Sequence, residues 1–326
     1  LSPEVYPQTL AIARAYPKFL ALGAVAHDAP YYRRGGGSPF EWVGSLLHGL
    51  GGTSEHTDTL RCLSLFGVSA SALTIPSSRS AAYAFLLGLL SHYAVDVVFH
   101  PPIFYFSGDY YALEIERRRL ARARHRLFEV YLDEDRRACG VSFPWPSSMK
   151  ALLKECAGST WSDICTTLAS AVTPAASALH PESIPDLKDE WQRAFSEMAF
   201  FQHLFLSPAW GGLAGLVKTL TRNRLYQYEV LFARGRRGRH AALHAPWSYR
   251  NPVSGEMVTA SLQELETRAV ELSLSLFFKI EEALSLGGIT PDTLQGGVSL
   301  NYGLRESAPE DATHFCSSGF HLPGLF

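Results

Sequence analysis

Three ionisable side chains recur at four-residue spacing inside an otherwise apolar stretch, Ala81 to His100 (AAYAFLLGLLSHYAVDVVFH). His92, Asp96 and His100 would project from one face of a helix, a turn apart. A buried carboxylate is costly unless it is paired, and a divalent metal would pair it, since His and Asp are good zinc ligands. The pattern therefore predicts a metal site. The alternative is a core helix whose polar side chains bond to neighbouring backbone.

The sequence also supplies ends for this helix. Pro76 and the serines that follow it can begin the helix, and Pro101 is expected to end it, because proline disfavours helix in the preceding residue. The apolar run from Ala81 to Phe99 is long enough to span a bilayer. Its polar face favours a protein interior instead, so we expect no transmembrane segment.

Further candidate ligands lie on both sides of this helix. His125 and Glu129 repeat the i, i+4 spacing in HRLFE, within a helix predicted from Leu113 to Arg137. Two facing helices that each offer such a pair can bind metals between them. Seven ligands exceed what one zinc ion uses, and two metals about 4 Å apart suit displacement at phosphorus. The candidates are Asp28, His48, His92, Asp96, His100, His125 and Glu129.

The rest of the chain predicts an all-α fold, a multi-helix bundle that encloses a cluster of two or three zinc ions. We expect one domain over residues 1–326, with a largely irregular tail from 288 to 326, and we find no strand pattern. The other predicted helices are Leu10–Ala21 (interrupted at Pro17), Trp42–Leu50, Cys62–Leu73, Leu187–Leu206, Leu213–Arg234 and Ser261–Leu286, the last with a capping box of Ser261 and Glu264.

Composition excludes several classes of protein. A hydrophobic content of 47% and a charged content of 18% describe a folded chain with a sizeable core, not a disordered one. The net charge of −2 gives no general attraction to nucleic acid. Five scattered cysteines do not form a disulfide scaffold. The chain begins at Leu1 and shows no signal segment. A cleaved signal would leave the same trace, so the sequence does not decide between export of a processed form and a cytoplasmic location.

Three segments in order, LGAVAHDAPYY, FLLGLLSHYAVDVVFHP and HRLFE, resemble the bacterial zinc-dependent phospholipase C family. The resemblance covers about Leu20 to Asp133. It implies that Asp28, His48, His92 and Asp96 bind one zinc, that His100, His125 and Glu129 bind a second, and that Asp28 is also the general base or orients water. His56 is a rival for the role of His48. His27 replaces the usual proline. The family often binds a third zinc, and no histidine precedes His27 here, so either that site is lost, or its ligands lie in sequence before Leu1, or His27 substitutes.

The resemblance implies a hydrolase that cuts the glycerol-side phosphodiester bond of phosphatidylcholine-like lipids by metal-activated water. It would act on phospholipid at a membrane or micelle surface and release diacylglycerol and a phosphorylated head group. Arg122 could hold the phosphate, although most such arginine runs are solvated. Tyr31, Tyr32 and Tyr105 could contact the head group, although aromatic side chains near a core more often only pack.

Two alternatives to a phospholipase stay open on the sequence. Related zinc-dependent single-strand nucleases share the fold and the cluster, so a nuclease or another phosphoesterase ranks second. The chain lacks a strong basic and aromatic track for nucleic acid. The third interpretation is a metal-stabilised helical binding protein without catalysis.

Overall fold

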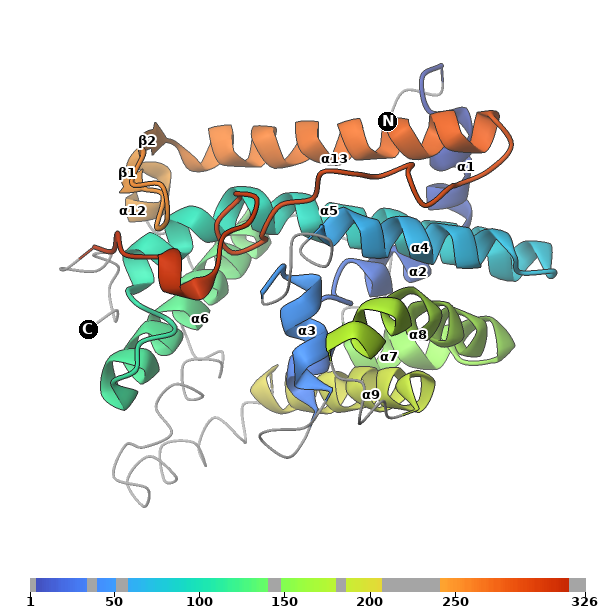
Figure 1. The fold of residues 1–326 in the computed structure, drawn as a ribbon, viewed down its shortest axis with the longest axis horizontal. Helices are drawn as coiled ribbons and strands as arrows, with labels where there is room; N and C mark the ends of the chain where they lie inside the picture. Colours follow the sequence, from blue (N-terminus) through green and yellow to red (C-terminus); the bar gives the residue numbers. More distant parts are fainter. Residues whose placement is uncertain are drawn as a thin grey trace. The chain divides into compact units, whose positions relative to one another are not determined.

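The structure, a computed structural model, describes residues 4–33, 40–50, 58–139, 148–179, 186–206 and 241–316. His56 and the helix predicted over Leu213–Arg234 lie outside these residues. The described chain is helical apart from loops and one short hairpin, so the all-α prediction is confirmed (Figure 1). It forms two compact units: Leu1–Val97, Pro144–Phe201 and Arg268–Glu306 make up the first, and Val98–Phe143, Gln202–Thr267 and Ser307–Phe326 the second.

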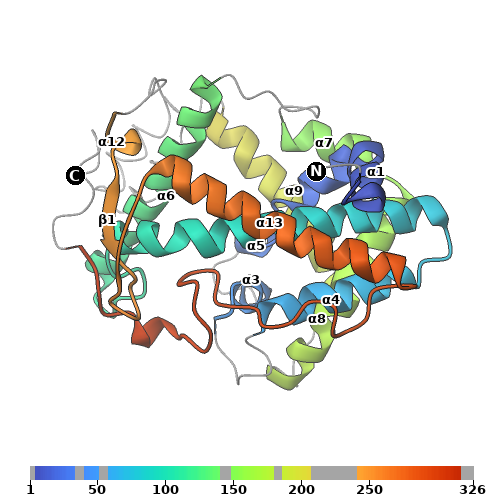
Figure 2. The ribbon, with the colours of Figure 1, turned by 90° about the horizontal axis from the view of Figure 1, so that it is seen from above.

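The first unit is built around the N-terminal two thirds of the long helix α5. α4 packs against α8, α2 against α7, and α3 against the 3-10 turn η1. The chain after α13 returns along α4 (Figure 2), where Ser64 Oγ bonds to both backbone groups of Leu294. The elements wholly or mainly in this unit are α1 (Pro7–Ala15), α2 (Pro17–Gly23), η1 (Ala29–Tyr32), α3 (Glu41–Leu47), α4 (Thr59–Ser71), α5 (Pro76–Ser107), α7 (Met149–Cys156), α8 (Ser159–Leu179), α9 (Leu187–Leu206) and α13 (Leu262–Ser285).

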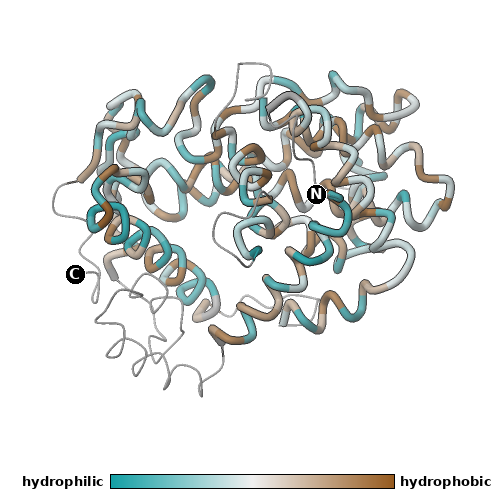
Figure 3. Tube along the Cα trace, turned by 60° about the horizontal axis from the view of Figure 1, so that its bottom comes forward, coloured by the Kyte–Doolittle hydropathy of each residue, from teal (hydrophilic) through white to brown (hydrophobic). Residues whose placement is uncertain are grey.

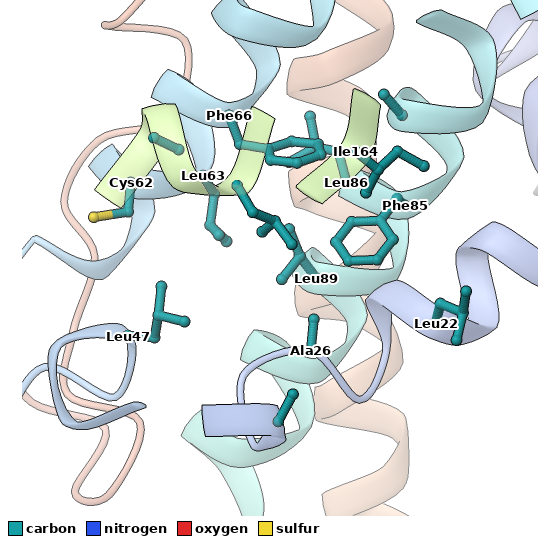
Figure 4. Close-up of a cluster of buried hydrophobic side chains, with 14 of the residues drawn as sticks. Leu22, Ala26, Leu47, Cys62, Leu63, Phe66, Phe85, Leu86, Leu89 and Ile164 are labelled. Atoms are coloured by element: carbon teal, nitrogen blue, oxygen red, sulfur yellow. The ribbon is translucent and has the colours of Figure 1, made fainter. Parts of the chain in front are cut away.

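The core of the first unit forms where α4 and α8 meet α5. Phe85 and Leu86 from α5 lie beside Phe66 from α4 and Ile164 from α8 (Figure 4). The rings of Phe66 and Phe85 stack with their centroids 5.6 Å apart. Hydrophobic and hydrophilic stretches alternate along many of the helices (Figure 3), as expected of helices that bury one face.

Two glycines let α2 and α5 approach each other at backbone contact. A Cβ on Gly23 would overlap the carbonyl oxygen of Phe85, and one on Gly88 would overlap that of Leu20. No other residue fits at either position without moving a backbone. The glycines therefore set the position of the residues that follow α2 against α5.

The second unit combines the end of α5 with α6 (Ile115–Ala138), the short helix α12 (Ala241–His244), the strands β1 (Trp247–Arg250) and β2 (Met257–Ala260), and the 3-10 turn η2 (Pro309–Asp311). The buried carboxylate of Asp135 on α6 contacts His244 Nε2 at 2.9 Å and so ties α12 to α6. The ring of Phe128 meets that of Trp247 edge to face, which packs β1 on α6.

The prediction that Pro101 ends the central helix is wrong, because α5 continues to Ser107. Proline inside a helix costs about 3 kcal/mol or more. The continued helix buries Ile103, Phe104 and Phe106, and each such side chain contributes about 1.5–3 kcal/mol. The summed burial of these three side chains is of the same size as the cost of the two prolines, Pro101 and Pro102, and so offsets it.

The sequence pattern also gave no sign of the short hairpin in the second unit. β1 and β2 pair antiparallel, with Trp247 opposite Ala260. Between them, Asn251 Oδ1 accepts hydrogen bonds from Val253 N and Ser254 N, which closes the turn. A strand of four residues is too short for an alternation of apolar and polar residues to be recognised in the sequence. α7, α8 and α12 were not predicted either, whereas α9 matches its predicted ends and the capping box of Ser261 and Glu264 is present.

α5 is long and apolar enough to cross a membrane by composition, the only such helix within the described ranges. In its most apolar window, 67% of the residues are buried inside the protein, as in a core helix.

Gly88→Ala should destabilise the protein by about 1–3 kcal/mol, because the added methyl group must separate α5 from α2. Urea unfolding measures the change, and Ser80→Ala on the same helix is the control, expected within about 0.5 kcal/mol of the parent. Equal stability of Gly88→Ala and the parent would show that the backbones are not in contact.

Candidate metal centre

The first unit brings together four predicted ligands, which we call the first cluster: Asp28, His48, His92 and Asp96. Asp28 precedes η1, His48 ends α3, and the other two lie one turn apart on α5. Ligand atoms of Asp28, His48 and His92 all lie within 4.8 Å of one another. Asp96 Oδ2 is 2.9 Å from His92 Nε2 and 3.5 Å from His48 Nε2. His48 Nε2 is also 3.5 Å from Asp28 Oδ1.

Backbone carbonyls orient both imidazoles of the first cluster. His92 Nδ1 is 2.8 Å from the Ala24 carbonyl oxygen, and His48 Nδ1 is 2.7 Å from that of Gly44. A carbonyl oxygen only accepts hydrogen bonds, so each Nδ1 is the donor. In a neutral imidazole the lone pair is then on Nε2, the atom that faces the carboxylates. This is how metal-binding histidines are held.

The facing groups of the first cluster are all acceptors unless a cation or protons join them. Burial lowers the pKa of His48, but hydrogen bonds and charges of Asp28 and Asp96 outweigh burial and raise it to about 10. Burial also lowers the pKa of His92, and the charge of Asp96 is the main influence that raises it to about 9. Without metal, protons therefore supply the positive charge. The donor set and its geometry fit a divalent metal such as zinc.

Two neighbours of the first cluster were also singled out from the sequence. His27 is buried and stacks on His92, with ring centroids 4.6 Å apart, and neither of its ring nitrogens has a hydrogen-bond partner within the described chain. Burial, followed by the charge of His92, holds its pKa well below the ordinary value. The Tyr31 hydroxyl lies 3.3 Å from His48 Nδ1.

The second unit brings together the other three predicted ligands, the second cluster: His100, His125 and Glu129. Their ligand atoms also lie within 4.8 Å of one another. Glu129 Oε1 is 3.1 Å from His125 Nε2 and 3.6 Å from His100 Nε2. Burial acts to raise the pKa of Glu129, but the two histidines outweigh it and hold the pKa well below its ordinary range. The Glu129 side chain keeps 44% of its surface exposed, whereas His100 and His125 are buried, so solvent reaches the cluster through Glu129.

Aromatic side chains surround His125 on the second cluster. The rings of Phe104 and Tyr110 lie 4.7 Å and 5.2 Å from its ring. The guanidinium carbon of Arg122 lies 4.9 Å from the centre of the Tyr110 ring. Arg122 is thus attached to the surroundings of the second cluster.

Tyr32 and Tyr105, the other two tyrosines predicted to contact a head group, pack against phenylalanine rings. The ring of Tyr32 meets Phe201, with centroids 6.2 Å apart. The ring of Tyr105 meets Phe106, and its carbonyl oxygen accepts a hydrogen bond from Cys316 N.

Sequence reasoning missed the supports of the first cluster. The His48 carbonyl oxygen accepts a hydrogen bond from Leu300 N, in a segment predicted only as irregular. Val298 N donates to the Tyr93 hydroxyl, next to His92. Gly49 takes φ +75°, the left-handed conformation that ends α3 after His48. Only this glycine, beside a candidate ligand, was a signal in the sequence.

One of three comparisons with known proteins found a match. A family profile described as zinc dependent phospholipase C matches residues 1–192. No curated protein and no solved structure gave a significant match. The match covers more than half of the chain and includes every residue of both clusters. The chain belongs to the zinc-dependent phospholipase C family.

Proposed function

We propose that this protein hydrolyses the glycerol-side phosphodiester bond of phosphatidylcholine-like lipids and releases diacylglycerol and a phosphorylated head group. Membership of the family implies a phospholipase C and zinc dependence. The observation that carries the proposal is the convergence of two backbone-anchored imidazoles, His48 and His92, on the Asp96 carboxylate.

In this proposal the first cluster holds one zinc ion and the second cluster holds another. His92 and Asp96 lie one turn apart on α5, and His125 and Glu129 lie one turn apart on α6, so each pair can face one ion. His27, stacked on His92, is kept as a candidate ligand for a third ion. When bound, zinc polarises the phosphoryl oxygens, activates water and stabilises the charge of the leaving oxygen.

Asp28 is the proposed general base. One oxygen faces His48, and 45% of the Asp28 side chain is exposed, so its carboxylate can accept a hydrogen bond from a water molecule. That water adds its oxygen to phosphorus, and its proton passes to the Asp28 carboxylate. The bond from phosphorus to the glycerol oxygen breaks, the glycerol oxygen takes a proton from solvent and leaves as the diacylglycerol hydroxyl, and Asp28 returns its proton to solvent.

Two further side chains have proposed roles in binding. Arg122 lies over Tyr110, which contacts the ring of His125, and this supports a contact with the lipid phosphate. Tyr31 lies beside His48 and is partly exposed, which supports a contact with the head group. Tyr32 and Tyr105 lie against Phe201 and Phe106, which lends them less support.

The zinc-loaded protein should convert short-chain phosphatidylcholine to phosphocholine and diacylglycerol, as followed by phosphorus NMR. In water enriched with heavy oxygen, the label should enter the phosphocholine. A chelator should abolish turnover and zinc should restore it. Release of free choline would assign cleavage to the other ester bond. Cleavage of single-stranded oligonucleotides alone would indicate a nuclease, and bound zinc without any turnover would indicate a binding protein.

The same amide substitution at two carboxylates separates catalysis from metal binding. Asp28→Asn should retain most zinc and lose about 10²–10⁴-fold in turnover, the range for a general base. Asp96→Asn should lose zinc as well, because Asp96 is buried and faces both imidazoles. Elemental analysis and initial rates test both variants. An active Asp28→Asn protein would remove Asp28 from the mechanism.

Metal removal should make stability depend on pH. The pKa values of about 10 for His48 and about 9 for His92 exceed the unfolded value of 6.5. Their contribution is therefore fully present below pH 6.5 and is lost as the pH rises through 9 and 10.

The melting temperature of the chelator-treated protein should fall over this pH range. Zinc should restore it most strongly at the upper end, because metal binding displaces the protons. Asp96→Asn, which removes the carboxylate that holds these protons, is the control and should show a weaker dependence. A rise in melting temperature on adding zinc that does not change with pH would contradict the assignment.

A further inference from the structure

The loop between α5 and α6 presents the most exposed large apolar side chain in the described part of the chain. Leu113 is 97% exposed, and Ile115, at the first turn of α6, is 53% exposed. An isolated exposed apolar residue is ordinary on a protein surface. Leu113 and Ile115 differ from such isolated residues in the contacts of their loop, in the charge beside them and in their position near the second cluster.

The loop holds Leu113 in place rather than leaving it free. Asp109 Oδ1 accepts a hydrogen bond from Tyr111 N at 3.1 Å. Ala112 is buried, and its carbonyl oxygen accepts a hydrogen bond from Arg118 Nη1 at 3.2 Å. The neighbours of Leu113 are therefore anchored on α6 while its side chain projects into solvent.

We call Leu113 and Ile115 the apolar tip. A strongly basic stretch of sequence follows it. Between Leu113 and Arg126 the sequence has six arginines against two glutamates, in a chain of net charge −2. Glu116 pairs with Arg119 at 2.7 Å, and Glu114 lies 3.9 Å from the largely exposed Arg117. The excess positive charge complements a surface of anionic lipid. An exposed apolar group beside cations is the combination that binds membrane interfaces.

The tip is connected to the second cluster through Tyr110. Its ring lies 5.2 Å from that of His125 and 4.9 Å below the Arg122 guanidinium. Leu113 follows only three residues later, so the two Cα atoms are at most about 11 Å apart. A lipid surface that receives Leu113 therefore lies beside the second cluster.

We propose that Leu113 and Ile115 insert into the surface of a lipid aggregate, and that the arginines at the start of α6 bind the phosphates of anionic lipids there. The inference rests on the proposed function for the lipid nature of the substrate. It adds how the protein reaches a lipid that is packed in a bilayer.

The test uses zinc-loaded protein and sucrose-loaded vesicles of phosphatidylcholine, with or without phosphatidylglycerol, made as phosphonate analogues that cannot be cleaved at the glycerol side. Leu113→Gln should weaken binding by about tenfold or more, the effect of withholding one leucine from an apolar phase. Leu286→Gln is the matched control, since Leu286 is 81% exposed at the end of the first unit's α13 segment. It should bind like the parent.

The charged part of the proposal has its own measurement. Arg117→Gln should weaken binding by about fivefold on vesicles that contain phosphatidylglycerol and leave binding to phosphatidylcholine alone unchanged. At high salt, the stronger binding of the parent to vesicles that contain phosphatidylglycerol should decline, and so should the loss caused by Arg117→Gln.

The outcomes separate this inference from the proposed function. Monomeric short-chain phosphatidylcholine should be cleaved equally by the parent and Leu113→Gln, and equal melting temperatures show that both are folded. If neither cleaves it but vesicle binding still requires Leu113, the proposed function fails and the docking tip stands. Three results would contradict the insertion of Leu113. The parent and Leu113→Gln could bind vesicles equally, or Leu113→Gln and Leu286→Gln could lose vesicle binding equally. Leu113→Gln could also lose self-association and keep its lipid binding.

Discussion

The first unit depends on the carboxylate of Asp96 in an apolar helix, opposite two imidazole nitrogens that carry lone pairs. Three acceptors in a buried place repel one another unless positive charge lies between them. Protons meet this need in part, which is why the pKa values of His48 and His92 are so high. A divalent cation meets it without that protonation. The metal dependence implied by the family thus has a physical basis in one residue and its neighbours.

The orientation of these imidazoles depends on how closely backbones approach. The Ala24 carbonyl reaches His92 because α2 and α5 touch at Gly23 and Gly88. A side chain at either glycine would move Ala24 away from His92 and free the ring to rotate. The glycines therefore help to position His92 in the candidate metal centre, although they are not candidate ligands themselves.

The segment from 294 to 300, far along the chain from the first cluster, also supports that cluster. Asp58 caps α4 and also accepts hydrogen bonds from Gly296 N and Gly297 N. This holds the segment from 294 to 300 in place, so that Leu300 N can bond to the His48 carbonyl. A stretch without regular secondary structure thereby contributes to the placement of a candidate ligand.

The sequence by itself determined the pairs of candidate ligands and most helices around them. His92 with Asp96, and His125 with Glu129, lie within single helices, where the periodicity of the helix places residues four apart on one face. The capping box of Ser261 and Glu264 is equally local. Tertiary structure decided the other features. These are the continuation of α5 through Pro101, the β1–β2 hairpin, the contact of His27 with His92, and the hydrogen bonds of the first cluster with Ala24 and Leu300. These features depend on burial and on hydrogen bonds between residues far apart in the chain, and no local pattern records which distant backbone will supply the partner.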